Sequence, residues 1–253
     1  MNYKVEGTGK PVVFIHGLSD NLLFWEFLAS NLKNYYQVIR MDLRGHGDTE
    51  LGNDVITIGL LADDLKNLLN EMGIENDVDI IGFSLGGAVA LDFAIRYPRM
   101  VSSLVLMSSF CRADEYLSNI LNQFKEALNN SFEEFYDLIL PMVLCPQVIK
   151  DNSEELEVLK ALASKTANTQ AYIQSADACL NFNVEKDLSQ INVPTLILSG
   201  KWDSISLLTS QKNLKNKIKN SKLIVFDNVK HNLLVGRNNA VILDILKDFL
   251  KII

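Results

Sequence analysis

The chain has 253 residues, of which 48% are hydrophobic and 22% are charged, as is typical of a folded globular protein rather than a disordered one. Its formal net charge of −7, without any basic cluster, disfavours a nucleic-acid partner, whose phosphates would repel it. The N-terminus lacks the apolar core of a signal peptide, and no apolar stretch is long enough to span a bilayer. We therefore expect a cytoplasmic protein with no membrane partner.

Apolar runs and helical patterns alternate along the first 108 residues. The expected strands are 11–15, 36–41, 78–81 and 101–108, and the expected helices are 22–28, 56–72 and 88–94. This alternation predicts an α/β fold, with a mostly parallel sheet and helices on both faces. Ligands bind beyond the carboxyl ends of the strands in such sheets. His16, Asp42 and Ser84 all fall at such ends.

The alternation stops near residue 110 and resumes near residue 187. Helical patterns at 117–128, 132–140, 154–163 and 171–180, interrupted by Pro141 and Pro146, predict a helical insertion. Further strands are expected at 193–200 and 223–226, with helices at 204–218 and 241–250. The expected organisation is thus an α/β core of residues 1–109 and 187–253, with a helical insertion of residues 110–186.

The sequence Gly82-Phe83-Ser84-Leu85-Gly86 has a strand before it and a helix after it, the context that the G-x-S-x-G motif requires. The two glycines leave room at a bend where a Cβ would collide with the neighbouring chain. The bend would hold the Ser84 hydroxyl above the sheet, at the N-terminus of a helix. An ordinary glycine-rich turn is the alternative interpretation.

A serine hydroxyl becomes an effective nucleophile when a base takes its proton, and histidine is the usual base. The chain has three histidines. His16 follows a strand directly, in a loop suited to holding an oxyanion, and His46 is held between two glycines. His231 follows the last expected strand in a loop long enough to reach Ser84. Elimination therefore favours His231 as the base.

The base needs a carboxylate that fixes its tautomer. Asp203, at the end of the strand 193–200, is the best candidate, and Asp42 and Asp114 are the alternatives. Asp227 is expected to be a turn residue. The order serine, aspartate, histidine is the one expected when the serine follows a strand on a sharp turn.

An acyl-transfer transition state also needs fixed N–H donors for its oxyanion. We expect these donors to be the backbone N–H groups of Leu85, after the nucleophile, and of Leu18, in the loop after the first core strand. Most aromatic residues of the insertion should pack it onto the sheet. A few residues, among which we name Trp25, Phe110 and Phe135, would line an apolar substrate pocket.

Several motifs together make the chain resemble the α/β-hydrolase superfamily, and within it the small serine esterase and lactonase-like members. They are Phe14-Ile15-His16-Gly17, Asp42-Leu43-Arg44-Gly45-His46-Gly47, Gly82-Phe83-Ser84-Leu85-Gly86-Gly87, Gly200-Lys201-Trp202-Asp203 and Lys230-His231-Asn232. The resemblance implies the α/β-hydrolase fold, a helical cap formed by the insertion, and a catalytic triad of Ser84, Asp203 and His231. The short N-terminus indicates that an antiparallel edge strand is reduced or absent.

The expected function is that of a serine hydrolase that cleaves an ester, lactone or thioester of a small, partly apolar molecule through an acyl-enzyme on Ser84. No cofactor is expected. No metal is expected either, because the three widely spaced cysteines, Cys111, Cys145 and Cys179, fit reduced thiols better than a metal site or a disulfide framework. A small-ligand receptor of the same fold is one alternative, and a C–C bond hydrolase or perhydrolase with the same triad is another.

Overall fold

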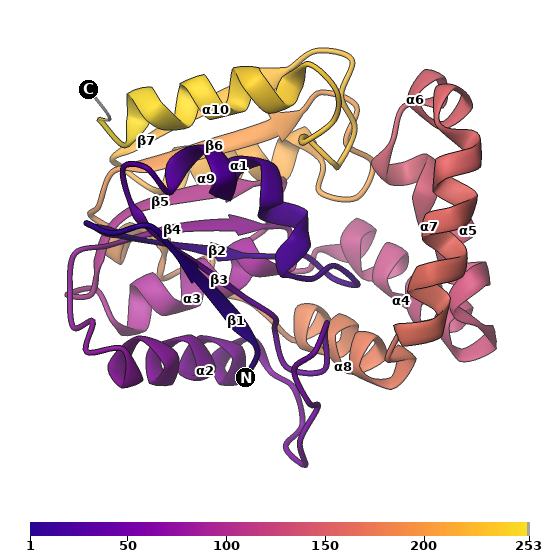
Figure 1. Ribbon diagram of the computed structural model, residues 1–253, viewed down its shortest axis with the longest axis horizontal. Helices are drawn as coiled ribbons and strands as arrows, with labels where there is room; N and C mark the ends of the chain where they lie inside the picture. The colour runs from indigo at the N-terminus through magenta and orange to yellow at the C-terminus, as the bar shows by residue number, and fades with distance from the viewer. Residues whose placement is uncertain (252–253) are drawn as a thin grey trace.

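A seven-stranded sheet in the order β1-β3-β2-β4-β5-β6-β7 forms the centre of the computed structural model, which describes residues 1–251 (Figure 1). The strands are β1 (Tyr3–Glu6), β2 (Pro11–Ile15), β3 (Gln37–Met41), β4 (Val78–Phe83), β5 (Val101–Met107), β6 (Thr195–Gly200) and β7 (Ser221–Phe226). Only β1 is antiparallel to its neighbour, and every other pair of adjacent strands is parallel. The mostly parallel sheet is therefore confirmed, and the antiparallel edge strand is short but present.

Alternate side chains of each central strand enter two separate hydrophobic clusters, one on each face of the sheet. In β2, Val13 and Ile15 belong to one cluster, and Val12 and Phe14 belong to the other. The first face is covered by α2 (Ile58–Glu71), α3 (Leu85–Arg96) and α9 (Leu208–Lys217), and the second by α1 (Glu26–Leu32) and α10 (Asn238–Phe249). Short 3₁₀ helices, η1 (Leu22–Trp25) and η2 (Leu188–Gln190), precede α1 and β6. Burial on both faces explains why these strands are apolar along their whole length.

The chain between β5 and β6 forms five helices at the end of the sheet where α3 begins (Figure 1). They are α4 (Glu115–Asn130), α5 (Phe132–Val143), α6 (Pro146–Asp151), α7 (Ser153–Thr166) and α8 (Thr169–Leu180). Asp114, Ser131 and Asn168 cap α4, α5 and α8 by accepting hydrogen bonds from backbone N–H groups. The two ends of this segment meet, since the Val184 N–H donates to the Cys111 carbonyl at 2.9 Å.

Two local expectations were wrong. Pro141 does not interrupt the second helix of the segment, because α5 continues to Val143 although the proline removes one backbone N–H donor from its last turn. The sequence pattern also missed α6, a helix of six residues with no buried side chain. Pro146 stands at its first turn, a position that proline favours.

Two kinds of feature are absent from the described residues. No helix among residues 1–251 is both long and apolar enough to cross a bilayer. The same residues contain no group of three or more His, Cys, Asp or Glu side chains placed to hold a metal ion. The three cysteines are free thiols, and Cys111 and Cys179 are buried.

Candidate active site

Ser84 lies on a tight bend between β4 and α3 and has a left-handed backbone conformation, with φ of 51° and ψ of −114°. The bend needs its flanking glycines. A Cβ on Gly82 would lie 2.4 Å from the Gly86 carbonyl oxygen, and a Cβ on Gly86 would lie 2.2 Å from the Ile15 carbonyl oxygen. The Ser84 hydroxyl makes no capping hydrogen bond to α3. The bend therefore leaves this hydroxyl available above the carboxyl end of β4.

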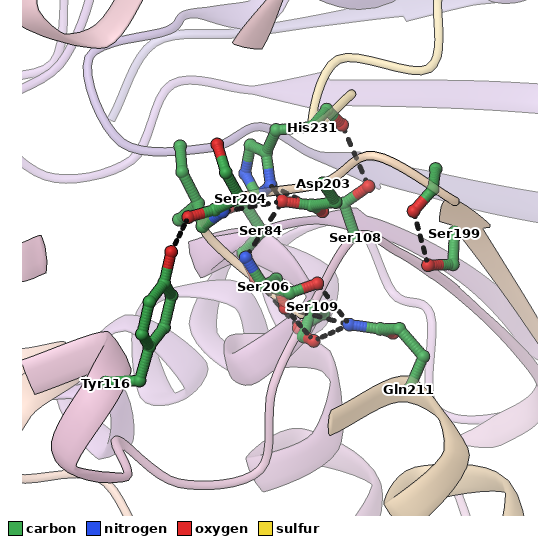
Figure 2. Close-up of polar contacts among 12 residues, drawn as sticks. Ser84, Ser108, Ser109, Tyr116, Ser199, Asp203, Ser204, Ser206, Gln211 and His231 are labelled. Atoms are coloured by element: carbon green, nitrogen blue, oxygen red, sulfur yellow. Dashed lines mark hydrogen bonds and ion pairs between the residues drawn. The ribbon is translucent and has the colours of Figure 1, made fainter. Parts of the chain in front are cut away.

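His231 and Asp203 are paired at the carboxyl ends of β7 and β6, next to Ser84 (Figure 2). The His231 Nδ1 lies 3.0 Å and 2.9 Å from the two carboxylate oxygens of Asp203, and both side chains are buried. This contact favours the tautomer with the proton on Nδ1, which leaves Nε2 as an acceptor. Such an imidazole can take a proton from a hydroxyl.

The loop that contains Asp203 is fixed by hydrogen bonds. The carboxylate accepts the backbone N–H groups of Ile205 and Ser206, both at 2.9 Å. The Ser206 hydroxyl donates to the Ser109 carbonyl and lies 2.8 Å from the amide nitrogen of Gln211 (Figure 2). On the other side, the Ser108 hydroxyl donates to the His231 carbonyl at 2.8 Å. These contacts hold the pair in place without using the imidazole Nε2.

Ser84 and His231 line one cavity of about 360 Å³, a size suited to a small molecule. Leu18 and Leu85 line it as well. Leu85 is the first residue of α3, so its N–H has no acceptor within the helix. A more open hollow of about 570 Å³ near Arg44 contains neither serine nor histidine. The structure thus brings all five predicted residues of the reaction centre to one place.

The walls of the cavity are mainly apolar, and the insertion supplies many of them. Phe110 and Phe135 line it as expected. Trp25 does not: its side chain is fully buried in the core, with its ring 5.0 Å from that of Phe14. The preceding residue, Phe24, lines the cavity instead, because adjacent residues of a 3₁₀ helix point in different directions. Trp25 is therefore not a pocket residue.

Further lining residues escaped the sequence analysis. They include Asp20, Phe24, Phe83, Phe124, Phe132 and Tyr136. Phe83 immediately precedes Ser84 at the end of β4, so its position in the motif could have identified it. The phenylalanines of α4 and α5 carry no comparable signal, because the same spacing also occurs in helices that only pack against a core.

The other two histidines have structural contacts. The His16 Nδ1 donates to the Gly17 carbonyl at 2.8 Å, and its Nε2 accepts the Leu43 N–H at 2.9 Å. The His46 Nδ1 lies 3.0 Å from the Arg44 carbonyl. Burial lowers the pKa of His16 to about 4 and that of His46 to about 3. Both imidazoles are therefore neutral near pH 7, and their hydrogen bonds are to backbone groups of the loops after β2 and β3.

The alternative acids are committed elsewhere. Asp42 accepts the Leu22 N–H at 2.7 Å and the Asp48 N–H at 3.0 Å, and so ties the loop after β3 to the start of η1. Asp114 caps α4. Asp227 forms an exposed ion pair with Lys201.

A family model described as the alpha/beta hydrolase fold matches residues 10–237. The chain belongs to the α/β-hydrolase fold family. Within this family it is 30% identical, over 231 residues, to the AB hydrolase superfamily protein YisY of Bacillus subtilis, covering 89% of this chain and 86% of the relative. It is 29% identical over 227 residues to the pimeloyl-[acyl-carrier protein] methyl ester esterase of Neisseria meningitidis, covering 88% and 86%.

Solved structures of α/β hydrolases share the fold. MGS-M2, an α/β-hydrolase enzyme from a Medee basin deep-sea metagenome library, superimposes with a TM-score of 0.91 at 24% identity. The match covers 99% of this chain and 94% of MGS-M2. The fold class and the family resemblance predicted from the sequence are therefore confirmed, and the family includes esterases.

Proposed function

We propose that this protein is a serine hydrolase that cleaves a carboxylic ester of a small, partly apolar molecule through an acyl-enzyme on Ser84. The observation that supports this most directly is the pairing of His231 with Asp203 beside the cavity that Ser84 and His231 both line. Lactones and thioesters present the same carbonyl chemistry and belong to the same substrate class.

In the proposed reaction the Ser84 Oγ attacks the ester carbonyl carbon while the His231 Nε2 takes the hydroxyl proton. The bond from this carbon to the alcohol oxygen then breaks, and His231 gives its proton to the departing alcohol. A water molecule then attacks the acyl-enzyme while His231 takes its proton, and His231 returns the proton to Ser84 as the carboxylic acid departs. Asp203 holds the imidazole in position and stabilises its charged form throughout.

The backbone N–H groups of Leu18 and Leu85 would donate hydrogen bonds to the negative charge that develops on the carbonyl oxygen. Helix α3 adds the positive end of its dipole at this position. Residues 110–186 act as a cap over the site in this proposal, and residues 1–109 and 187–253 form the core that holds the reacting groups. The apolar walls favour substrates with an apolar part, because burying that part is favourable.

The test uses the purified protein and a series of p-nitrophenyl esters of increasing chain length. We expect hydrolysis by the wild type, loss of at least about a thousandfold in kcat in Ser84→Ala, and labelling of the wild type by a fluorophosphonate probe that Ser84→Ala abolishes. Ser153→Ala, which replaces an exposed serine on α7, is the matched control and keeps both properties.

Two results would contradict the proposal. One is a folded wild type that hydrolyses no ester of the series. The other is labelling that continues at an unchanged rate in His231→Ala. Trace hydrolysis, combined with a ligand that reshapes the cap, would favour the receptor alternative.

A further inference from the structure

The cavity contains one carboxyl group that the proposed reaction does not use, that of Asp20. Asp20 lies in the loop after β2. This loop folds back because Ser19 has a φ of 63° and the Asp20 N–H donates to the Gly17 carbonyl at 3.3 Å. The Asp20 Oδ2 consequently lies 3.0 Å from the position that a Cβ on Gly17 would occupy. Its carboxyl therefore faces the same cavity as Ser84 and His231.

Aromatic rings lie next to this carboxyl group. The Phe83 Cδ1 is 2.9 Å from the same position beside Gly17. The Phe83 ring stacks on that of Phe24, with centroids 4.7 Å apart, and lies 5.1 Å from the His231 ring. A carboxylate beside aromatic rings is a combination that can bind ammonium groups, by charge attraction and, where a ring face is open, by cation–π contact.

No lysine or arginine of the described residues compensates Asp20. The cavity is lined by neither lysine nor arginine, and no ion pair within residues 1–251 includes Asp20. Burial raises the pKa of Asp20 to about 7, although the nearby His231 and the Gly17 backbone act in the opposite direction. An isolated carboxylate in apolar surroundings repels a second anion strongly and attracts a cation.

We propose that Asp20 is a specificity-determining residue, which together with Phe24 and Phe83 forms a subsite for a cationic group and excludes substrates with a carboxylate near the scissile ester. The substrate class would be esters that contain an amine or a quaternary ammonium group. This inference rests on the proposed ester hydrolysis and adds a charge preference to it.

Asp20 has a second conceivable effect, because its carboxylate also attracts the imidazolium form of His231. That effect acts on every substrate alike, since the imidazolium forms in each reaction. A comparison of substrates with different charges therefore separates the two.

The experiment compares three p-nitrophenyl esters of similar size: trimethylammonio-butanoate, its neutral carbon isostere, and hemiglutarate. Rates are measured at about pH 8, where Asp20 is ionised. We expect Asp20→Asn to raise the anionic-to-neutral ratio of kcat/KM about tenfold and to lower the cationic-to-neutral ratio by a similar factor, mainly through KM. Asp244→Asn, which removes an exposed charge on α10, is the matched control and leaves both ratios within about twofold.

Asp20→Ser serves as a second neutral variant, and thermal unfolding checks that each variant folds. Equal changes for all three esters, or ratios that stay constant in both Asp20 variants, would overturn the subsite while leaving ester hydrolysis intact. A folded wild type that hydrolyses none of the three esters would overturn both proposals.

Discussion

At the scale of single residues, the Asp203 carboxylate has more partners than the imidazole it orients. It contacts the His231 Nδ1 with both oxygens and accepts two backbone N–H groups. These neighbours all require an acceptor at this position. Asparagine would place an NH₂ group against one of them and would favour the wrong tautomer of His231.

We therefore predict that Asp203→Asn lowers kcat on a neutral ester by about 10³ to 10⁴, with little change in KM. Steady-state kinetics on the ester series measure this, and circular dichroism checks the fold. Asp227→Asn is the control, because this aspartate is exposed and its ion pair is with the exposed Lys201. A fall in kcat of less than tenfold in Asp203→Asn would argue against the assigned role.

The sequence was sufficient to predict that Ser84, Asp203 and His231 lie close together, because each follows a strand whose pattern is easily recognised. It was not sufficient for the walls of the cavity. Phe24 and Trp25 are adjacent and equally apolar, and only the backbone of η1 decides which of them faces the cavity. Asp20 was missed because the direction of its side chain depends on the left-handed backbone of Ser19. That conformation cannot be predicted from a serine at this position.

At the scale of elements, the bend between β4 and α3 requires glycine at Gly82 and Gly86, where no side chain fits. Gly82 has no room for a Cβ, since the nearest contact would be a backbone carbonyl at 2.4 Å. Gly59, in the first turn of α2, is different: the closest atom to its Cβ would be the Arg96 Nη1 at 3.5 Å, an ordinary contact.

We predict that Gly82→Ala lowers the free energy of unfolding by at least about 2 kcal/mol, because backbone must move to accept the methyl group. Gly59→Ala changes it by less than about 1 kcal/mol, in the stabilising direction, because alanine favours the helix. Urea unfolding measures both. Equal stability of the two variants would show that the bend tolerates a side chain.

Helix α7 is weakly anchored to the rest of the molecule. None of its residues is buried, and Val158, Leu159 and Leu162 are each about half exposed. Helix α4, by contrast, buries six residues. Because local opening is easiest where little apolar surface is buried, we predict that the amides of α7 exchange with deuterium much faster than those of α4. Hydrogen exchange with mass spectrometry measures this, and equal protection would contradict it.

Sequence patterns located long elements well and short ones poorly. The buried strands and α2 have unambiguous apolar patterns, and α2 also has a capping residue, Thr57. The six residues of α6 give no such pattern because none is buried. At Pro141, proline usually ends a helix, and the sequence alone does not show that α5 continues for two residues beyond it.

At the scale of the whole molecule, the insertion and the core are joined next to the site. The Asn232 N–H donates to the Val143 carbonyl at 3.1 Å, and the Lys230 Nζ donates to the Pro141 carbonyl. The end of α5 therefore contacts the two residues on either side of His231. These two hydrogen bonds link the end of α5 directly to the loop that contains the proposed base.

The pH dependence of stability involves groups from several parts of this assembly. The folded-state pKa values of His16 and His46 are lowered to about 4 and about 3 from an ordinary value near 6.5, so below pH 6.5 the unfolded chain binds protons that the folded chain does not. These two histidines therefore lower the free energy of unfolding progressively as the pH falls below about 6.5. Asp20 acts oppositely, because its raised pKa lets the folded chain keep a proton that the unfolded chain has released above about pH 4.

We predict that the free energy of unfolding falls between pH 6.5 and pH 4.5, and falls more steeply in Asp20→Asn than in the wild type. One fully effective group changes the slope by about 1.4 kcal/mol per pH unit, and partial exposure of Asp20 to the cavity reduces that figure. Urea unfolding at pH 4.5, 5.5 and 6.5 measures both slopes, and contributions from groups that do not interact with Asp20 cancel in their difference. The free energy of unfolding of Asp244→Asn should depend on pH as that of the wild type does, because the charge of Asp244 is exposed. If the slope for Asp20→Asn also equalled that of the wild type, Asp20 would titrate normally in the folded protein. The carboxylate beside Gly17 would then be far better solvated than its surroundings imply.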